Sequence, residues 1–140
     1  QRLKGYFDAF GARGLTPDEA NIQHGDYMLQ GGYESMRRLL AEKKCTAVFV
    51  TNYEMTLGAV IAINEAGLKI PEEISIIGFD NMDLSRITHP RLTIVTQPLE
   101  QIGTQVAKLL LEHLTGSTPC APVSISLSTT LQEGASVRRL

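Results

Sequence analysis

Residues 46–79 have the sequence TAVFVTNYEMTLGAVIAINEAGLKIPEEISIIGF, and this stretch decides the fold. It begins with an apolar run at 46–50 and ends with a second one at 74–79, each typical of a strand buried on both faces. Between them, residues 55–66 are apolar nearly all round at helical spacing, and Gly67 ends that helix. A strand, a buried helix and a second strand form a βαβ unit, which predicts a parallel sheet.

The same alternation continues on the N-terminal side. Residues 3–10 place apolar side chains on one helical face. A second amphipathic helix is expected from Tyr33 to the two lysines at 43–44, because cations suit the negative end of the helix dipole. The short segment 21–25 between these helices is interpreted as the first strand of the sheet.

On the C-terminal side, a polar loop is predicted at 80–90 and a further strand at 92–96. Pro98 begins a long amphipathic helix that Gly116 ends. The alternation of apolar residues with Ser and Thr over 123–131 predicts an edge or half-exposed strand. The predicted fold class is therefore α/β, with a doubly wound parallel sheet flanked by helices in three α/β/α layers.

The composition excludes several classes of protein. The 140 residues suit one domain, and they are 43% hydrophobic and 20% charged, as in a soluble globular protein. Thirteen Lys and Arg against fifteen Asp and Glu give a net charge of −2, whereas binding to nucleic acid needs a concentrated basic surface. No apolar run approaches the ~20 residues that span a bilayer, so we expect no membrane protein.

Signatures of metal binding and catalysis are also missing from the sequence. Cys45 and Cys120 show no metal or redox spacing, which favours reduced thiols and a cytoplasmic location. The three histidines lack ligand spacing, and Asp80 and Asp83 come without a third metal-ligand motif. Neither a phosphate-binding glycine loop nor a nucleophile elbow occurs. We therefore expect no metal, no cofactor and no enzymatic activity.

Polar and aromatic residues directly follow the predicted strands. Because the carboxyl ends of parallel strands meet at one edge of a sheet, where ligands of this fold class bind, these residues are candidates for one site. An aromatic ring, two amides and a carboxylate together suit a neutral polyhydroxyl ligand such as a sugar. The candidates are Tyr27, Asn52, Asp80 and Gln97.

Each of these candidates also has a purely structural interpretation. Asn52 stands where a helix N-cap is expected, and Asp80 stands where an Asx turn is common. Tyr27 is of a type that more often belongs to a core than to a ligand platform. The sequence leaves both interpretations open for these three residues.

Motifs spread over nearly the whole chain carry a resemblance to a known family. The run GLKIPEEISIIGFDN at 67–81, followed by PRLTIVTQP at 90–98, is its most specific part, and RLKGYFDAF at 2–10 also fits. These motifs closely resemble the lactose-repressor (LacI/GalR) family of bacterial transcription regulators, in the effector-binding core that is similar to periplasmic sugar-binding proteins. Only the last ten residues depart, since the family tends to have Arg-x-Ser where this chain has Glu133 to Ser136.

The resemblance implies a hinge-closing sensor of two subdomains with its effector, a sugar or related metabolite, in the cleft between them. Matched motif by motif, the cleft contacts would be Arg2, Tyr27, Asn52, Asp80 and Gln97. Arg2 is a candidate through the resemblance alone. Tyr53 departs from the acidic residue that is common after the Asn, so the details of the ligand stay open.

The resemblance also implies how this chain relates to a whole regulator. Residues 1–140 would be the C-terminal subdomain of the effector-binding core, and operator DNA would be bound only through an absent helix-turn-helix domain. The helix at 98–116 would pack in the absent N-terminal subdomain, so we expect its apolar face to be covered by the body of this chain or by another chain. A homodimer is expected. The alternative is a periplasmic sugar-binding protein of an ABC transporter, which a signal peptide upstream would distinguish.

Overall fold

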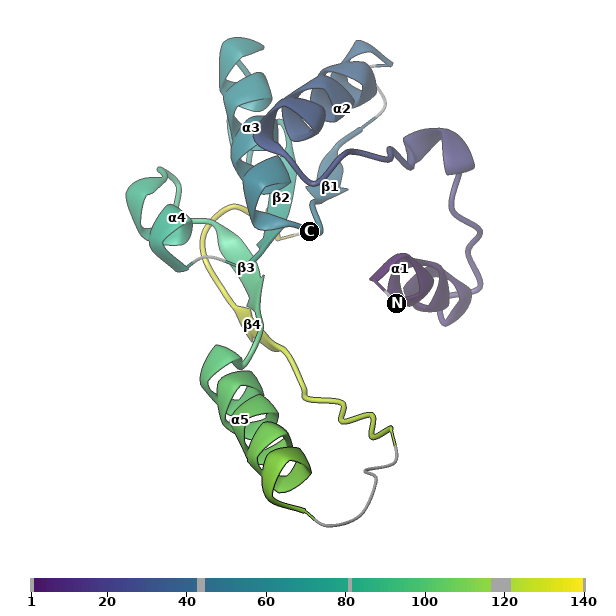
Figure 1. Ribbon diagram of the computed structural model, residues 1–140. Coiled ribbons are helices and arrows are strands. Elements are labelled where there is room, and N and C mark those ends of the chain that lie inside the picture. The colour runs from purple at the N-terminus through teal and green to yellow at the C-terminus, as the bar shows by residue number, and fades with distance from the viewer. Residues whose placement is uncertain (1, 43–44, 81, 117–121, 140) are drawn as a thin grey trace.

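A four-stranded mixed sheet forms the centre of the computed structural model, which describes residues 2–42, 45–80, 82–116 and 122–139. Its strands lie in chain order, and β1, β2 and β3 run parallel while β4 runs antiparallel to β3 (Figure 1). The predicted α/β class with a parallel sheet flanked by helices is confirmed, with one antiparallel strand added at the edge. The strands are β1 (Ala47–Phe49), β2 (Ser75–Phe79), β3 (Thr93–Thr96) and β4 (Thr130–Gln132).

Helices α2 (Leu29–Ala41) and α3 (Tyr53–Glu65) pack closely against each other beside the sheet (Figure 1). Two glycines allow this close approach: a Cβ added to Gly58 would lie 2.1 Å from the Leu29 carbonyl oxygen, and one added to Gly32 would lie 2.4 Å from the Met55 Cα. Both helices were predicted from their periodicity, although residues 43–44, expected to end α2, lie outside the described residues. The core between helices and strands includes Met36, Leu39, Ala59, Ile63, Ile74, Ile76, Leu92 and Ile94.

The prediction of a first strand at 21–25 is wrong. A single 3₁₀ turn, η1 (Glu19–Asn21), ends there, and the following residues up to α2 form no strand. A strand exists only where its N–H and C=O groups join a ladder, and β1 pairs with β2 alone among the described strands. The prediction of burial on both faces is therefore also wrong for β1, where Phe49 is 39% exposed, but correct for Ile76 of β2, which is fully buried.

The region between β2 and β3 is more regular than its polar sequence suggested. Residues 82–87 form a short helix, α4 (Met82–Ile87), so the prediction of a continuous loop over 80–90 is wrong there. Six residues are too few to show a helical period. The hydroxyl of Ser85, which is buried, donates a hydrogen bond to the Leu92 carbonyl oxygen at 2.7 Å and ties α4 to the start of β3.

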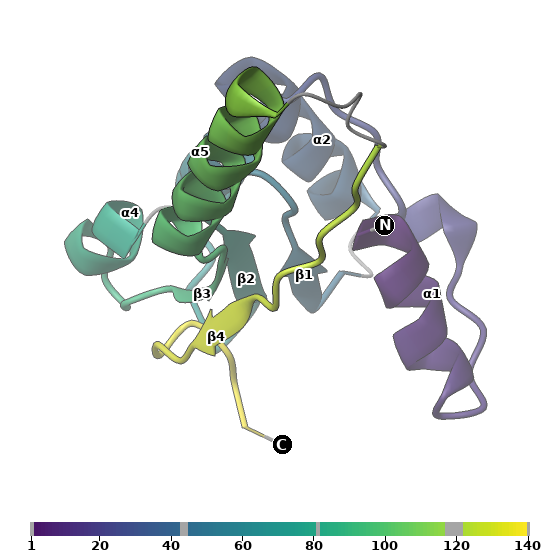
Figure 2. The same cartoon turned by 60° about the horizontal axis from the view of Figure 1, so that its bottom comes forward.

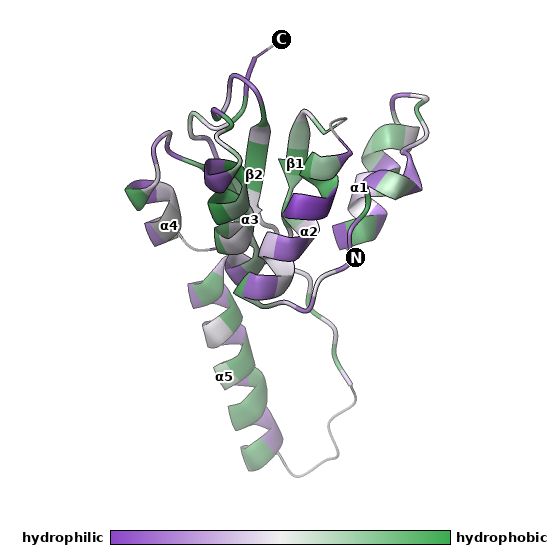
Figure 3. Ribbon diagram, turned by 90° about the horizontal axis from the view of Figure 1, so that it is seen from above, coloured by the Kyte–Doolittle hydropathy of each residue, from purple (hydrophilic) through white to green (hydrophobic). Residues whose placement is uncertain are grey.

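Two predicted helices form outside the core. Helix α1 (Arg2–Gly11) buries none of its residues, and its rings contact one another, with Tyr6 and Phe10 centroids 4.8 Å apart. Helix α5 (Leu99–Thr115) projects away from the sheet and also buries none of its residues (Figures 1 and 3). Its apolar face is therefore not covered by the described part of this chain, and Leu114 is 70% exposed.

The chain returns from α5 as an extended segment over 122–129 (Figure 2). The prediction of a strand over 123–131 is wrong for most of this range, because only Thr130 to Gln132 reach β3 and join its ladder. Alternating side chains indicate which residues suit a strand, but only a neighbouring strand completes the hydrogen bonds.

After β4, Ser136 connects the two central strands. Its side chain is fully buried, and its hydroxyl donates to the Ile76 carbonyl at 2.6 Å and accepts from the Thr93 N–H at 2.8 Å. The Ser136 carbonyl accepts from the Ile76 N–H at 2.9 Å. The segment that departs from the resembled motif thus closes the sheet at the end where β2 and β3 begin. Within the described residues, no helix has the length and apolar character needed to cross a membrane.

Candidate ligand-binding site

The carboxyl ends of the three parallel strands lie side by side. The Val50 N–H donates to the Ile77 carbonyl at 2.9 Å, and the Asp80 N–H donates to the Val95 carbonyl at 2.8 Å, so the pairing continues one residue past β1 and β2. Asn52, Asp80 and Gln97 follow directly at this edge, where the strand-end rule placed them.

Asn52 is the N-cap of α3. Its side-chain oxygen accepts a hydrogen bond from the Met55 N–H at 3.0 Å, and its own backbone is extended. The capping interpretation of this residue is therefore confirmed. The cap engages the amide oxygen only, and the nitrogen of the same amide carries N–H donors that take no part in it.

Asp80 and Gln97 form a side-chain pair. The Gln97 amide nitrogen donates to the Asp80 carboxylate at 2.8 Å, and both side chains are half-buried. Asp80 has a φ of 61°, in the left-handed region that costs most residues energy but that Asp and Asn tolerate. The hydrogen bond from the Asp80 N–H to β3 holds the backbone of this turn, and the hydrogen bond from Gln97 holds the carboxylate.

Arg2 reaches the same edge from α1. Its guanidinium lies 3.8 Å from the centroid of the Phe79 ring, and it donates a hydrogen bond to the Thr51 carbonyl oxygen. Phe79 directly precedes Asp80, and Thr51 directly precedes Asn52. The structure therefore brings Arg2, Asn52, Asp80 and Gln97 to one edge of the sheet, although they lie far apart in sequence.

Tyr27 lies in the turn before α2. It is 69% exposed and has a φ of 67°, in a turn where the Asp26 carboxylate accepts from the Met28 N–H at 2.9 Å. The interpretation of Tyr27 as a core residue is wrong, because the turn before α2 directs the chain outward. Its ring is a free aromatic face beside the cavity described next.

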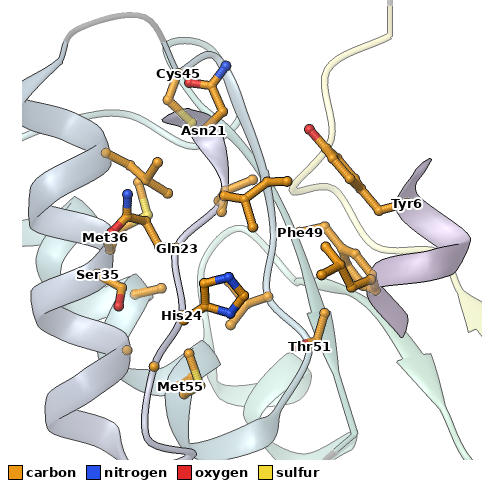
Figure 4. A pocket seen from close by; sticks show the side chains of 18 of the residues that line it. Tyr6, Asn21, Gln23, His24, Ser35, Met36, Cys45, Phe49, Thr51 and Met55 are labelled. Carbon is orange, nitrogen blue, oxygen red and sulfur yellow. The ribbon is translucent and has the colours of Figure 1, made fainter. Parts of the chain in front are cut away.

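A cavity of about 930 Å³ opens beside β1. Its walls come from α1, the segment 21–25, α2, β1 and α3, and Figure 4 shows Tyr6, His24, Met36 and Met55 around it. Arg2 and Tyr27 also line this space, whereas Asn52, Asp80 and Gln97 do not. The cavity therefore adjoins the strand-end site through Arg2 and Thr51 and is not the same space.

Cys45 lines this cavity and is a free, half-buried thiol. Burial raises its pKa, because desolvation disfavours the thiolate. The second cysteine of the sequence, Cys120, lies outside the described residues. Across the parts of the chain that the structure describes, no three His, Cys, Asp or Glu side chains are grouped so as to hold a metal ion.

The raised pKa predicts slow thiol chemistry at Cys45. In a Cys120→Ser variant, we expect Ellman's reagent to react more slowly at pH 8 with the folded protein than with the urea-unfolded protein. The ratio of the unfolded-state rate to the folded-state rate should shrink as the pH rises through the folded-state pKa of Cys45. Because the unfolded state loses this proton first, stability should also fall as the pH rises above the ordinary cysteine value. Equal rates for folded and unfolded protein would contradict the prediction.

Comparison with known proteins identifies the domain. A family model described as the periplasmic binding protein-like domain matches residues 1–137. The chain belongs to this family. This periplasmic binding protein-like domain also has a close likeness in fold to the solved structure of the transcriptional regulator CelR in complex with cellobiose, with a TM-score of 0.89 and 34% identity over 96% of this chain and 41% of that one.

Two curated relatives of the domain are named as transcriptional repressors. The repressor CytR of Escherichia coli K12 is 40% identical over 116 residues, which are 82% of this chain and 34% of CytR. The repressor PurR of Edwardsiella ictaluri is 38% identical over 115 residues, which are 81% of this chain and 34% of PurR. The predicted membership of the LacI family is confirmed, and the domain spans about a third of the length of these relatives.

The structure adds two residues, Phe79 and Thr51, to the predicted site. Phe79 belongs to a strand that the sequence predicts to be buried, and Thr51 directly precedes the candidate Asn52. Neither carries a signal in the sequence, because a ring in an apolar strand looks the same whether or not a cation lies over it, and a backbone carbonyl belongs to every residue.

Proposed function

We propose that this domain is the effector-binding part of a LacI-type transcription regulator and that its effector is a sugar or a related metabolite. The observation that carries the proposal is the pairing of Asp80 with Gln97 beside Arg2, at the carboxyl ends of the parallel strands. The binding residues are Arg2, Tyr27, Asn52, Asp80 and Gln97.

The chemistry of these side chains suits vicinal hydroxyl groups. An Asp80 carboxylate accepts hydrogen bonds from hydroxyls, while the Arg2 guanidinium and the Asn52 amide nitrogen donate to hydroxyl oxygens. The exposed ring of Tyr27 offers an apolar face to the C–H groups of a sugar ring. The CelR structure that resembles this domain holds a disaccharide, which supports the same ligand class here.

The other parts of the regulator follow from the same proposal. Residues 1–140 form the C-terminal subdomain of the core, and α5, with its exposed leucines, packs in the N-terminal subdomain. The whole protein is a cytoplasmic homodimer that binds operator DNA through a helix-turn-helix domain outside this chain and performs no catalysis. Effector binding acts by favouring one of two conformations of the core, which changes DNA affinity through linkage.

A periplasmic sugar-binding protein of an ABC transporter is the other function that such a domain suits. The relatives CytR and PurR are named as transcriptional repressors, and this favours the regulator.

Calorimetric titration of the intact protein with D-ribose, D-galactose, D-glucose and cellobiose tests the proposal. We expect at least one sugar to bind, and Asp80→Asn to weaken that binding about 10- to 100-fold, because it removes a charge-assisted acceptor. Asparagine tolerates the left-handed backbone at this position, so the fold should be retained.

Asp83→Asn is the matched control for Asp80→Asn. Asp83 is an exposed carboxylate three residues further on, in the first turn of α4, and its substitution should leave the affinity unchanged. If none of the four sugars binds, the assigned ligand class is wrong; if a sugar binds and both variants bind it like the unsubstituted protein, the assigned site is wrong.

A further inference from the structure

We infer that Phe79 is a positioning residue for the effector site. Its ring holds the guanidinium of Arg2 in the position and orientation in which Arg2 binds the ligand. This inference rests on the proposed function, since it concerns the same site. Three groups carry the inference: the Phe79 ring, the Arg2 guanidinium 3.8 Å from its centroid, and the Thr51 carbonyl that accepts from Arg2.

Arg2 needs such support because its own helix provides little. Helix α1 buries none of its residues, and Arg2 itself is exposed. A long side chain on such a helix would sample many rotamers, and ordering it at the moment of binding would weaken affinity. The contact with Phe79 and the bond to Thr51 restrict the guanidinium before any ligand arrives.

Phe79 is suited to this role by its burial. The residue is only 6% exposed at the end of β2, so its surroundings restrict the ring, and one face of the ring lies under the Arg2 guanidinium. A cation over an aromatic face is attracted by the ring quadrupole at distances up to about 6 Å. Stacking also leaves the edge of the guanidinium plane, where its N–H donors lie, available for hydrogen bonding.

The same strand end provides both charged partners of the ligand. Phe79 positions Arg2, and the next residue, Asp80, presents its carboxylate, held by Gln97 at 2.8 Å. A donor fork and an acceptor group are therefore set relative to each other by the last residue of β2 and the residue that directly follows it. This arrangement favours ligands whose neighbouring hydroxyls include one acceptor and one donor at a fixed spacing.

The first test needs no ligand. In the NMR spectrum of the unliganded protein, side-chain protons of Arg2 should be shifted upfield by the Phe79 ring current, whereas those of Arg13, an exposed arginine beyond the end of α1, should not. The Arg2 shift should vanish in Phe79→Leu and persist in Phe79→Tyr. Unshifted Arg2 signals in the unsubstituted protein would overturn the inference.

The second test measures affinity for whichever of the four sugars the intact protein binds. We expect Phe79→Leu to weaken binding about three- to tenfold and Phe79→Tyr to restore most of the loss, while Arg2→Ala weakens it at least as much as Phe79→Leu. Combining Arg2→Ala with Phe79→Leu should add nothing further, because both act through the same guanidinium. Ile76→Val removes core volume from the same strand and should leave affinity unchanged.

The outcomes separate this inference from the proposed function. If Arg2→Ala weakens sugar binding and Phe79→Leu does not, the site stands and the positioning role of Phe79 is wrong. If no sugar binds but the Arg2 protons show the ring-current shift, the proposed ligand class is wrong. The contact between Arg2 and Phe79 then exists, but it has no role in sugar binding.

Discussion

Replacement of Gly58 by alanine is expected to lower the free energy of unfolding by about 2–3 kcal/mol. The added Cβ would lie 2.1 Å from the Leu29 carbonyl oxygen and 2.6 Å from the Tyr33 nitrogen, both of them backbone atoms of α2. Neither atom belongs to a flexible side chain, so α2 and α3 have to separate. Alanine favours a helix over glycine by about 1 kcal/mol, which offsets only part of this loss.

Gly103→Ala is the matched control, because Gly103 also lies inside a helix but has no atom within 4 Å of an added Cβ. This substitution should leave stability unchanged or raise it by up to about 1 kcal/mol. Urea unfolding of both variants, followed by circular dichroism, gives the comparison. Equal midpoints for Gly58→Ala and Gly103→Ala would show that the two core helices do not approach as closely as the structure shows.

Replacement of Ser136 by alanine is expected to cost about 2–4 kcal/mol. The fully buried hydroxyl is a donor to the Ile76 carbonyl and an acceptor for the Thr93 N–H, and alanine removes both bonds without admitting water. Two backbone groups of the central strands would then lack this partner in a dry environment, where each costs about 1–3 kcal/mol.

Ser126→Ala serves as the control, since Ser126 lies in the exposed extended segment before β4. Its unfolding midpoint in urea should match that of the unsubstituted protein. Hydrogen exchange adds a local measurement: the Thr93 amide should exchange faster in Ser136→Ala. Unchanged exchange at Thr93 together with unchanged stability would exclude the bridging role of Ser136.

Most of the helices were predicted from apolar spacing, including α1 and α5, which bury no residue in the described part of the chain. Strands β2 and β3 and helices α2 and α3 bury a face against one another, and that burial determines their apolar spacing. The segments 21–25 and 123–129 were predicted as strands and are not, because a strand also depends on a neighbour that composition does not specify. Helix α4 was missed because six residues are too short for a period.

The residues of the candidate site also differ in how far the sequence predicts them. Topology alone placed Asn52, Asp80 and Gln97 at one edge, since all three follow strands of the same parallel sheet. Arg2 needed the family resemblance, because it contacts Thr51 across a separation of 49 residues that no local pattern encodes. The role of Phe79 could not be predicted from the sequence, because only the distance from its ring to a cation distinguishes it from an ordinary core residue.

The exposed helix α5 is joined to the sheet in a way that has a mechanical consequence. The chain leaves through β3 and comes back through β4, which are adjacent, with Thr96 opposite Thr130 and its hydroxyl donating to the Thr130 carbonyl at 3.2 Å. Both connections of α5 to the sheet therefore lie at the same edge, so a displacement of α5 relative to the sheet would act first on the end of β3 and the start of β4. Gln97 directly follows Thr96, the last residue of β3, and its amide donates to the Asp80 carboxylate. Such a displacement would therefore reach the hydrogen bond that holds the proposed ligand-binding carboxylate.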